Sequence, residues 1–111
     1  METILIVRCA DAELARLEQE LRESGLDTVV CASADAALGA VQEGDVDLAV
    51  LDVALPEGGG LEALRRLRKR HTRLELPIIA LAAADHGQNI VELLTAGAND
   101  CVAKQIGRAH V

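Results

Sequence analysis

The chain has 111 residues, half of them hydrophobic, and carries a formal net charge of −7. This length suits one domain with a real core rather than two domains, and the acidic balance argues against general nucleic-acid binding. Because Phe, Trp and Tyr are absent, the chain lacks the stacking platforms used for single-stranded nucleic acids, and its core must be aliphatic.

Short apolar segments predict five strands. Continuous apolar runs, unlike alternating ones, are typical of strands that are buried on both faces. The predicted strands are Thr3–Val7, Thr28–Ala32, Val46–Leu51, Pro77–Ala82 and Asp100–Ala103.

Helical patterns follow each of the first four strands. Asp11 is a candidate N-cap for the first helix, which ends at Ser24–Gly25, and Ser33 caps the second, which runs to Val41. Pro56 and the glycines at 58–60 predict a turn before the third helix. The apolar residues of the last two helices are Leu61, Leu64 and Leu67 before Arg70, and Ile90, Leu93 and Leu94 before Gly97, with a loop at 85–87 before the fourth helix.

Strands that alternate with helices at this spacing predict a parallel, doubly wound α/β sheet with helices on both faces. The carboxyl ends of the strands meet at one edge, where ligands and chemistry collect in open sheets of this kind. The residues expected at that edge are Arg8, Cys9, Asp52, Ala82 and Lys104.

Four segments resemble, in order and spacing, the landmarks of receiver domains in the two-component response-regulator family. They are ILIV at the start, DLAVLDVALP in the middle, PIIALAA later and GANDCVAK near the end. The resemblance runs from about Thr3 to Ile106 and implies a flavodoxin-like, five-stranded receiver fold in a bacterial signalling protein. It places Asp52 in the phosphoacceptor position with Lys104 as its partner. Residues 1–111 are thus expected to form a single receiver-like domain with an incomplete last helix.

Several positions depart from the family pattern. Where the family has two magnesium-binding acids after the first strand, this chain has Arg8 and Cys9. Ala82 replaces the hydroxyl residue that closes the fourth strand, Cys101 replaces the aromatic switch residue, and Gln105 replaces a proline. These replacements predict a receiver domain that is degenerate at its metal-binding site.

The charge around Asp52 disfavours a metal ion. Magnesium takes oxygen ligands, usually including carboxylates, whereas Arg8 and Lys104 bring two positive charges to the single charge of Asp52, with Asp11 the only spare acid nearby. We therefore expect no cofactor. We favour an ion pair of Asp52 with Arg8 or Lys104 over a usable phosphoacceptor, with Arg8 extending into solvent as an alternative.

The resulting function is a signalling module that acts by protein–protein interaction, with a histidine kinase or phosphotransfer protein as the implied partner, and not an enzyme. The runner-up is a conventional receiver phosphorylated on Asp52. A small flavodoxin-like cofactor binder is disfavoured, because no phosphate-binding glycine loop follows the first strand and no aromatic residue can stack a flavin.

The remaining features concern the cellular compartment, the surface and the oligomeric state. Three cysteines without a CxxC pair indicate a reduced, cytoplasmic chain, with Cys9 and Cys101 as small core residues, and no apolar run is long enough to span a membrane. His71, His86 and His110 are expected on the solvated surface. The basic run 65–73 is assigned to the outer face of a helix and its exit loop, in preference to a docking patch for an acidic partner. The incomplete last helix predicts a homodimer that covers the exposed sheet face.

Overall fold

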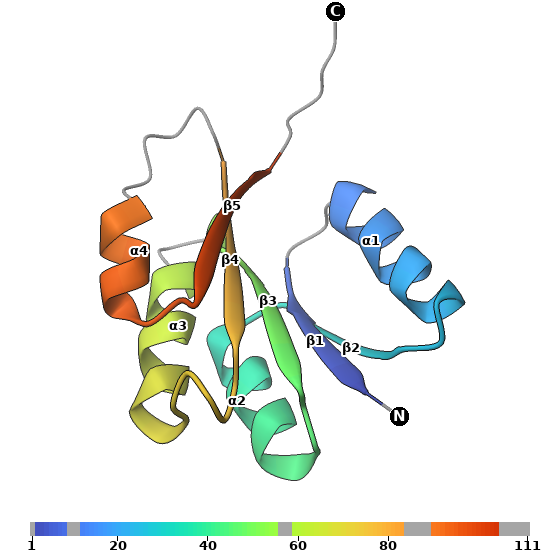
Figure 1. The fold of residues 1–111 in the computed structure, drawn as a ribbon, viewed down its shortest axis with the longest axis horizontal. Coiled ribbons are helices and arrows are strands. Elements are labelled where there is room, and N and C mark those ends of the chain that lie inside the picture. The colour runs from blue at the N-terminus through green and yellow to red at the C-terminus, as the bar shows by residue number, and fades with distance from the viewer. Residues whose placement is uncertain (1, 9–11, 56–58, 84–89, 105–111) are drawn as a thin grey trace, which may run out of the picture.

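The computed structural model describes residues 2–8, 12–55, 59–83 and 90–104, in which strands and helices alternate (Figure 1). The strands are β1 Thr3–Val7, β2 Asp27–Cys31, β3 Leu48–Asp52, β4 Ile78–Ala83 and β5 Asp100–Lys104. The helices are α1 Ala12–Glu23, α2 Ala34–Glu43, α3 Gly59–Arg70 and α4 Ile90–Ala96.

All five strands form one parallel sheet in the order β2-β1-β3-β4-β5. The chain adds β2 on one side of β1 and then β3, β4 and β5 on the other, so the sheet is doubly wound. The order reverses between β1 and β3, where Val7 is the register partner of Leu51. In doubly wound sheets this reversal is where ligands bind, at the carboxyl ends of the strands. The predicted fold class is confirmed.

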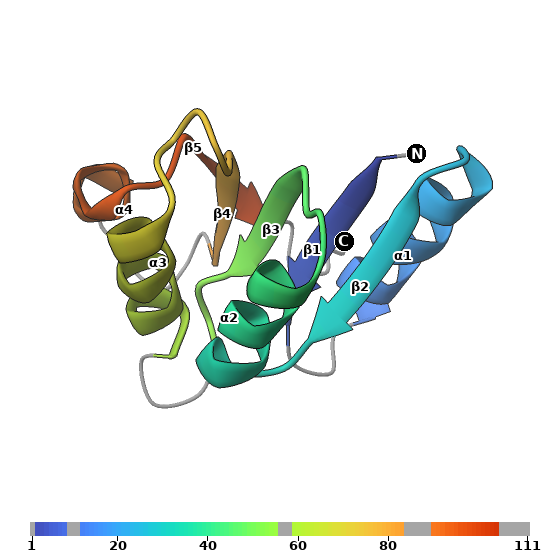
Figure 2. The ribbon, with the colours of Figure 1, turned by 90° about the horizontal axis from the view of Figure 1, so that it is seen from below.

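Two hydrophobic clusters lie on opposite faces of the sheet. On one face, Leu17 and Leu21 of α1 pack against Ile4, Ile6 and Val50. On the other face, α2, α3 and α4 cover a larger cluster, and Figure 2 shows these three helices on the side of the sheet away from α1. Alternate residues of β1 and β3 contribute to both clusters, since successive side chains of a strand point to opposite faces. Two-sided burial explains why these strands read as continuous apolar runs.

The predicted elements are present, with ends that differ by one or two residues. The prediction of a turn over all three glycines at 58–60 is wrong, because Gly59 and Gly60 lie in the first turn of α3. A Cβ at Gly60 would lie only 2.5 Å from the Cα of Val53. The glycine therefore lets the helix start directly against the backbone that follows β3.

Three of the predicted helix boundaries are confirmed by their cap geometry. The Oγ of Ser33 accepts a hydrogen bond from the backbone N–H of Ala36 at 3.1 Å, which satisfies one of the first donors of α2. Gly25 and Gly97, which follow α1 and α4, have φ values of 94° and 128°, the left-handed region that favours glycine. The candidate cap Asp11 lies outside the described residues.

Arg68 organises the segment that follows α3. Its guanidinium donates hydrogen bonds of 2.8–2.9 Å to the carbonyl oxygens of His71, Thr72, Leu76 and Gly97 and to Asn99 Oδ1. Burial lowers the pKa of Arg68, and the positive charge of Arg73 lowers it further. The prediction that His71 is a solvated surface residue is wrong. His71 is half-buried, its Nε2 is shielded from solvent, and its carbonyl accepts from Arg68.

Some predicted features fall outside the described residues. These are the loop at 85–87, His86, His110 and everything after Lys104. Among the residues that are described, the longest helices have 12 residues, and none is both long and apolar enough to cross a bilayer.

Candidate functional site

Asp52 is the last residue of β3 and lies at the carboxyl edge of the sheet. Its side chain is 3% exposed, which makes it the one buried charged residue in the part of the chain that the structure describes. Its Oδ1 accepts a hydrogen bond from the backbone N–H of Ala54 at 2.9 Å, and the N–H of Val53 continues the β3–β4 pairing by donating to Leu81 O. The turn after β3 thus positions the carboxylate.

Arg8 lies at the same edge, one strand away. It follows Val7, the register partner of Leu51, just as Asp52 follows Leu51. Its backbone N–H donates to Cys31 O at 2.8 Å, and its side chain is only 18% exposed. The alternative in which Arg8 extends into solvent is therefore wrong.

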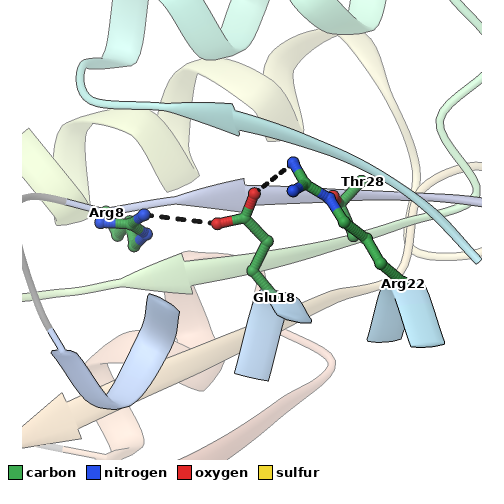
Figure 3. A network of polar contacts seen from close by, with 4 residues as sticks. All are labelled: Arg8, Glu18, Arg22 and Thr28. Carbon is green, nitrogen blue, oxygen red and sulfur yellow. Dashed lines mark hydrogen bonds and ion pairs between the residues drawn. The ribbon is translucent and has the colours of Figure 1, made fainter. Parts of the chain in front are cut away.

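The Arg8 guanidinium forms an ion pair with α1. Its Nη2 lies 3.4 Å from Glu18 Oε1, and Glu18, 12% exposed, also contacts Arg22 through Oε2 (Figure 3). Arg22 in turn donates a hydrogen bond from Nε to Thr28 Oγ1 at 2.8 Å. One carboxylate therefore lies between two guanidinium groups and balances the charge that Arg8 brings toward the edge.

Glu18 is absent from the predicted site residues, although the sequence holds a signal for it. It lies on the same stripe of α1 as Leu14, Leu17 and Leu21, one turn after Leu14. A charged side chain on an apolar stripe needs a partner when it is buried. That partner is supplied by Arg8, which is ten residues away in sequence and close only because α1 packs back on the sheet.

The other predicted site residues lie on β4 and β5. Ala82 is buried and pairs with Ala103, while Cys101 pairs with Ala80 and packs against the core. Burial raises the pKa of the Cys101 thiol, and the negative charge of Asp100 raises it further. Cys101 is a free, half-buried thiol that packs beside the core cluster, so its assignment as a small core residue stays a prediction.

Two predictions at this edge remain untested. Lys104 ends β5 in register with Ala83, but its side chain lies outside the described residues. Cys9 also lies outside them. The pairing of Asp52 with Arg8 or Lys104 therefore stays a prediction.

A divalent metal ion does not fit the described residues of this edge. Magnesium prefers a site rich in oxygen ligands with carboxylates among them, whereas the described residue that follows β1 at this edge, beside the strand that Asp52 ends, is Arg8. Within residues 2–8, 12–55, 59–83 and 90–104, no three His, Cys, Asp or Glu side chains gather closely enough to hold a metal.

The family model of the response regulator receiver domain matches residues 4–111. The chain belongs to this family. The receiver domain spans less than half the length of several curated relatives. It is 41% identical over 101 residues to the uncharacterized transcriptional regulatory protein YkoG of Bacillus subtilis, covering 91% of this chain and 43% of YkoG. It is 36% identical over 106 residues to the transcriptional regulatory protein AfsQ1 of Streptomyces coelicolor, covering 96% of this chain and 46% of AfsQ1.

A third relative is of another class. The aerobic respiration control sensor protein ArcB of Escherichia coli is 30% identical over 103 residues, which cover 93% of this receiver domain and 13% of ArcB. Domains of this kind therefore occur both in regulatory proteins and in a sensor protein.

Solved structures agree with the fold. The receiver domain of the response regulator TorR superposes with a TM-score of 0.83 at 31% identity, covering 96% of this chain and 86% of that one. A putative response regulator from Chloroflexus aurantiacus gives a TM-score of 0.79 at 34% identity, covering 93% and 84% of the two chains. Family, relatives and fold together identify a receiver domain of two-component signalling, and this class of domain signals through protein partners.

Proposed function

We propose that this receiver domain is a signalling module that acts through contacts with other proteins, and that Mg²⁺-dependent phosphorylation of Asp52 is impaired or absent. The proposal rests on Arg8, which stands where the family has a magnesium-binding acid. Arg8 follows β1 at the carboxyl edge of the sheet, as Asp52 ends the neighbouring β3, and its guanidinium, 18% exposed, pairs with Glu18.

The chemical reason is that Arg8 and Cys9 replace the acids that would hold the cation on which phosphoryl transfer to a carboxylate depends. Transfer to a carboxylate depends on positive charge that contacts both the incoming phosphoryl oxygens and the acceptor. A guanidinium can supply some of that charge, but Arg8 already shares its charge with Glu18. Ala82, at the end of β4, offers no hydroxyl to the phosphoryl group.

The second candidate is a conventional receiver that is phosphorylated on Asp52. The burial of Asp52 at the carboxyl edge supports it, as does the similarity to the regulatory proteins YkoG and AfsQ1. In this case the missing acids would slow phosphorylation without abolishing it.

Treatment with acetyl phosphate and millimolar Mg²⁺, followed by intact-mass analysis, separates the two candidates. We expect the wild-type chain to stay largely unmodified. The double substitution Arg8→Asp and Cys9→Asp should raise labelling, because it restores the two acids. The matched control is Arg16→Asp, which changes the charge at an exposed position of α1 and should leave labelling unchanged.

Phosphorylation of the wild-type chain would instead support the second candidate. A stable gain of one phosphoryl group in the wild-type chain, lost in Asp52→Asn, would establish the conventional receiver. The same variants can be tested for Mg²⁺ binding by following backbone amide shifts during titration. Saturable shifts confined to the surroundings of Asp52 in the wild-type chain would contradict the proposal.

The partner is expected to be a histidine kinase or a phosphotransfer protein. The similarity to a segment of the sensor protein ArcB supports a place in a phosphorelay, and the similarity to transcriptional regulators supports a place upstream of an output. Any DNA-binding or enzymatic output is assigned to residues outside this domain.

A further inference from the structure

The basic run at the end of α3 divides into two groups of side chains. Arg68 donates to backbone carbonyls, and Arg73 donates to Leu94 O at 2.7 Å, so both stabilise the fold. Arg65, Lys69 and Arg70 are exposed and form no ion pair with any described residue. Three uncompensated positive charges thus lie on one helix of a chain whose net charge is −7.

Two of these charges border a groove between α2 and α3, the neighbouring helices in Figure 2. A hollow of about 410 Å³ lies between the helices. Arg66, Lys69 and Arg70 line it from α3, and Asp35, Leu38, Gly39 and Gln42 line it from α2. The lining therefore combines a basic wall with a partly apolar floor.

Gly39 shapes the floor of this groove. A Cβ built on Gly39 would meet nothing within 4 Å, and its backbone has an ordinary helical conformation. Neither packing nor conformation therefore requires glycine here, although glycine is unfavourable in a helix interior. Its consequence is on the surface, where the missing side chain leaves room above α2 beside Leu38.

An ion pair across the groove shows that a side chain of the basic wall binds a carboxylate. Arg66 Nη1 lies 2.9 Å from Asp35 Oδ1 across the groove, and the Asp35 side chain is 86% exposed. Exposed ion pairs contribute little to stability, so a carboxylate from another molecule can replace Asp35 at small cost.

We propose that the groove between α2 and α3 is a docking site for an acidic segment of a protein partner. Carboxylates of the segment contact Arg66, Lys69 and Arg70, and a small apolar side chain lies over Gly39. Because the wider chain is acidic, the attraction acts only close to the groove, within a Debye length of ~10 Å at 0.1 M salt. The site is separate from Asp52 and does not depend on phosphorylation.

The test measures binding of a short fluorescein-labelled peptide of Glu, Ala and Leu by fluorescence anisotropy at ~0.1 M salt, where the net negative charge of the chain is screened beyond ~10 Å, with amide shifts to locate the site. We expect shifts in the groove-facing parts of α2 and α3, and weaker binding of a matched peptide with Gln in place of Glu. Reversal of Lys69 and Arg70 together to Glu should weaken binding roughly tenfold. Asp35→Asn should strengthen it by up to roughly twofold, because Arg66 loses the nearer of its two internal carboxylate partners and keeps Glu62.

Two variants act as controls. Arg65→Glu removes an equally exposed charge from the same helix but outside the groove, so it should change the affinity much less than reversal at Lys69 and Arg70. Gly39→Leu adds a side chain at a position where a Cβ meets nothing within 4 Å, so it should fill part of the groove and weaken binding while thermal unfolding shows a folded chain. An equal loss for Arg65→Glu, full affinity for Gly39→Leu, shifts outside the two helices, or tighter binding of a DNA oligonucleotide than of the peptide would each overturn the proposal.

Discussion

Glu18 of α1 forms the ion pair that links Arg8, at the edge of the sheet, to this helix. Its carboxylate lies between Arg8 and Arg22 and is 12% exposed. The substitution Glu18→Gln leaves Arg8 poorly compensated at a site with little solvent, which we expect to lower the free energy of unfolding by about 1–2 kcal/mol. Urea denaturation measures this loss.

A matched control is available on the same helix. Glu20 is exposed, and Glu20→Gln should change the unfolding free energy by less than ~0.5 kcal/mol. If both variants unfold at the same urea concentration, Glu18 does not balance the charge of Arg8.

Adjacent glycines at the start of α3 give a second test at the scale of single residues. A Cβ at Gly60 would overlap the backbone of Val53 at 2.5 Å, whereas a Cβ at Gly59 would lie 3.4 Å from the side chain of Leu55. Gly60→Ala should therefore destabilise the fold by about 2–3 kcal/mol. Gly59→Ala should be neutral or stabilise it by up to ~1 kcal/mol, because alanine favours the helix.

Thermal unfolding of the two variants decides the matter. Equal melting temperatures would show that α3 can shift away from the turn after β3 without loss of stability. The turn would then hold Asp52 less firmly than the contact of Gly60 with Val53 indicates.

Among the elements, the segment from the end of α3 to β5 depends on one arginine. Arg68 donates to carbonyls after α3, to the carbonyl of Gly97 after α4, and to Asn99, whose Oδ1 also accepts from the N–H of Ile78. Arg68→Ala removes the shared donor and should lower the unfolding free energy by about 3 kcal/mol. Arg68→Lys should recover little of it, because an ammonium group cannot reach the same acceptors in a planar arrangement.

Arg65→Ala is the control for these two variants. Because Arg65 is exposed on the same helix, this variant should unfold like the wild-type chain. Hydrogen exchange adds a local readout. Faster exchange confined to residues after α3 and around Gly97 is expected in Arg68→Ala, and uniform exchange across the chain would contradict the assignment.

The elements also show which parts of the fold a sequence can predict. Continuous apolar runs identify the strands because they are buried on both faces, and Ser33, Gly25 and Gly97 mark helix ends through local backbone chemistry. These features depend on neighbours in sequence. Asp52 and Arg8 share one edge because each lies at the carboxyl end of a parallel strand, which the alternation of strands and helices already predicts.

Features that depend on contacts distant in sequence were not predictable in this way. Gly60 starts α3 directly against the backbone of Val53, and His71 is half-buried where its carbonyl accepts from Arg68. The role of Glu18 likewise requires knowing that α1 packs over β1. In each case, contacts within the folded chain determine the residue's structure, and the local sequence pattern does not.

For the whole molecule, the remaining question is what covers the outer part of the sheet on the α1 side. Val102 of β5 is the register partner of Leu81, so both side chains point to the face that α1 occupies. Leu81 packs against the cluster under α1, but Val102 is 47% exposed. In Figure 1, α1 lies over the β1–β2 side and away from β5. None of the described helices covers this part of the face.

We therefore expect the chain to form a dimer through this face at micromolar concentration. Apolar surface that a dimer buries contributes ~25 cal/mol per Å², so covering Val102 favours association. Val102→Glu should shift the equilibrium to monomer, because it places a charge in the centre of the interface. Leu74→Glu is the control, since Leu74 is fully exposed in the segment after α3 and should leave the dimer intact. Sedimentation equilibrium of the three proteins is the measurement, and a wild-type monomer at every concentration would show that other residues of the chain cover Val102.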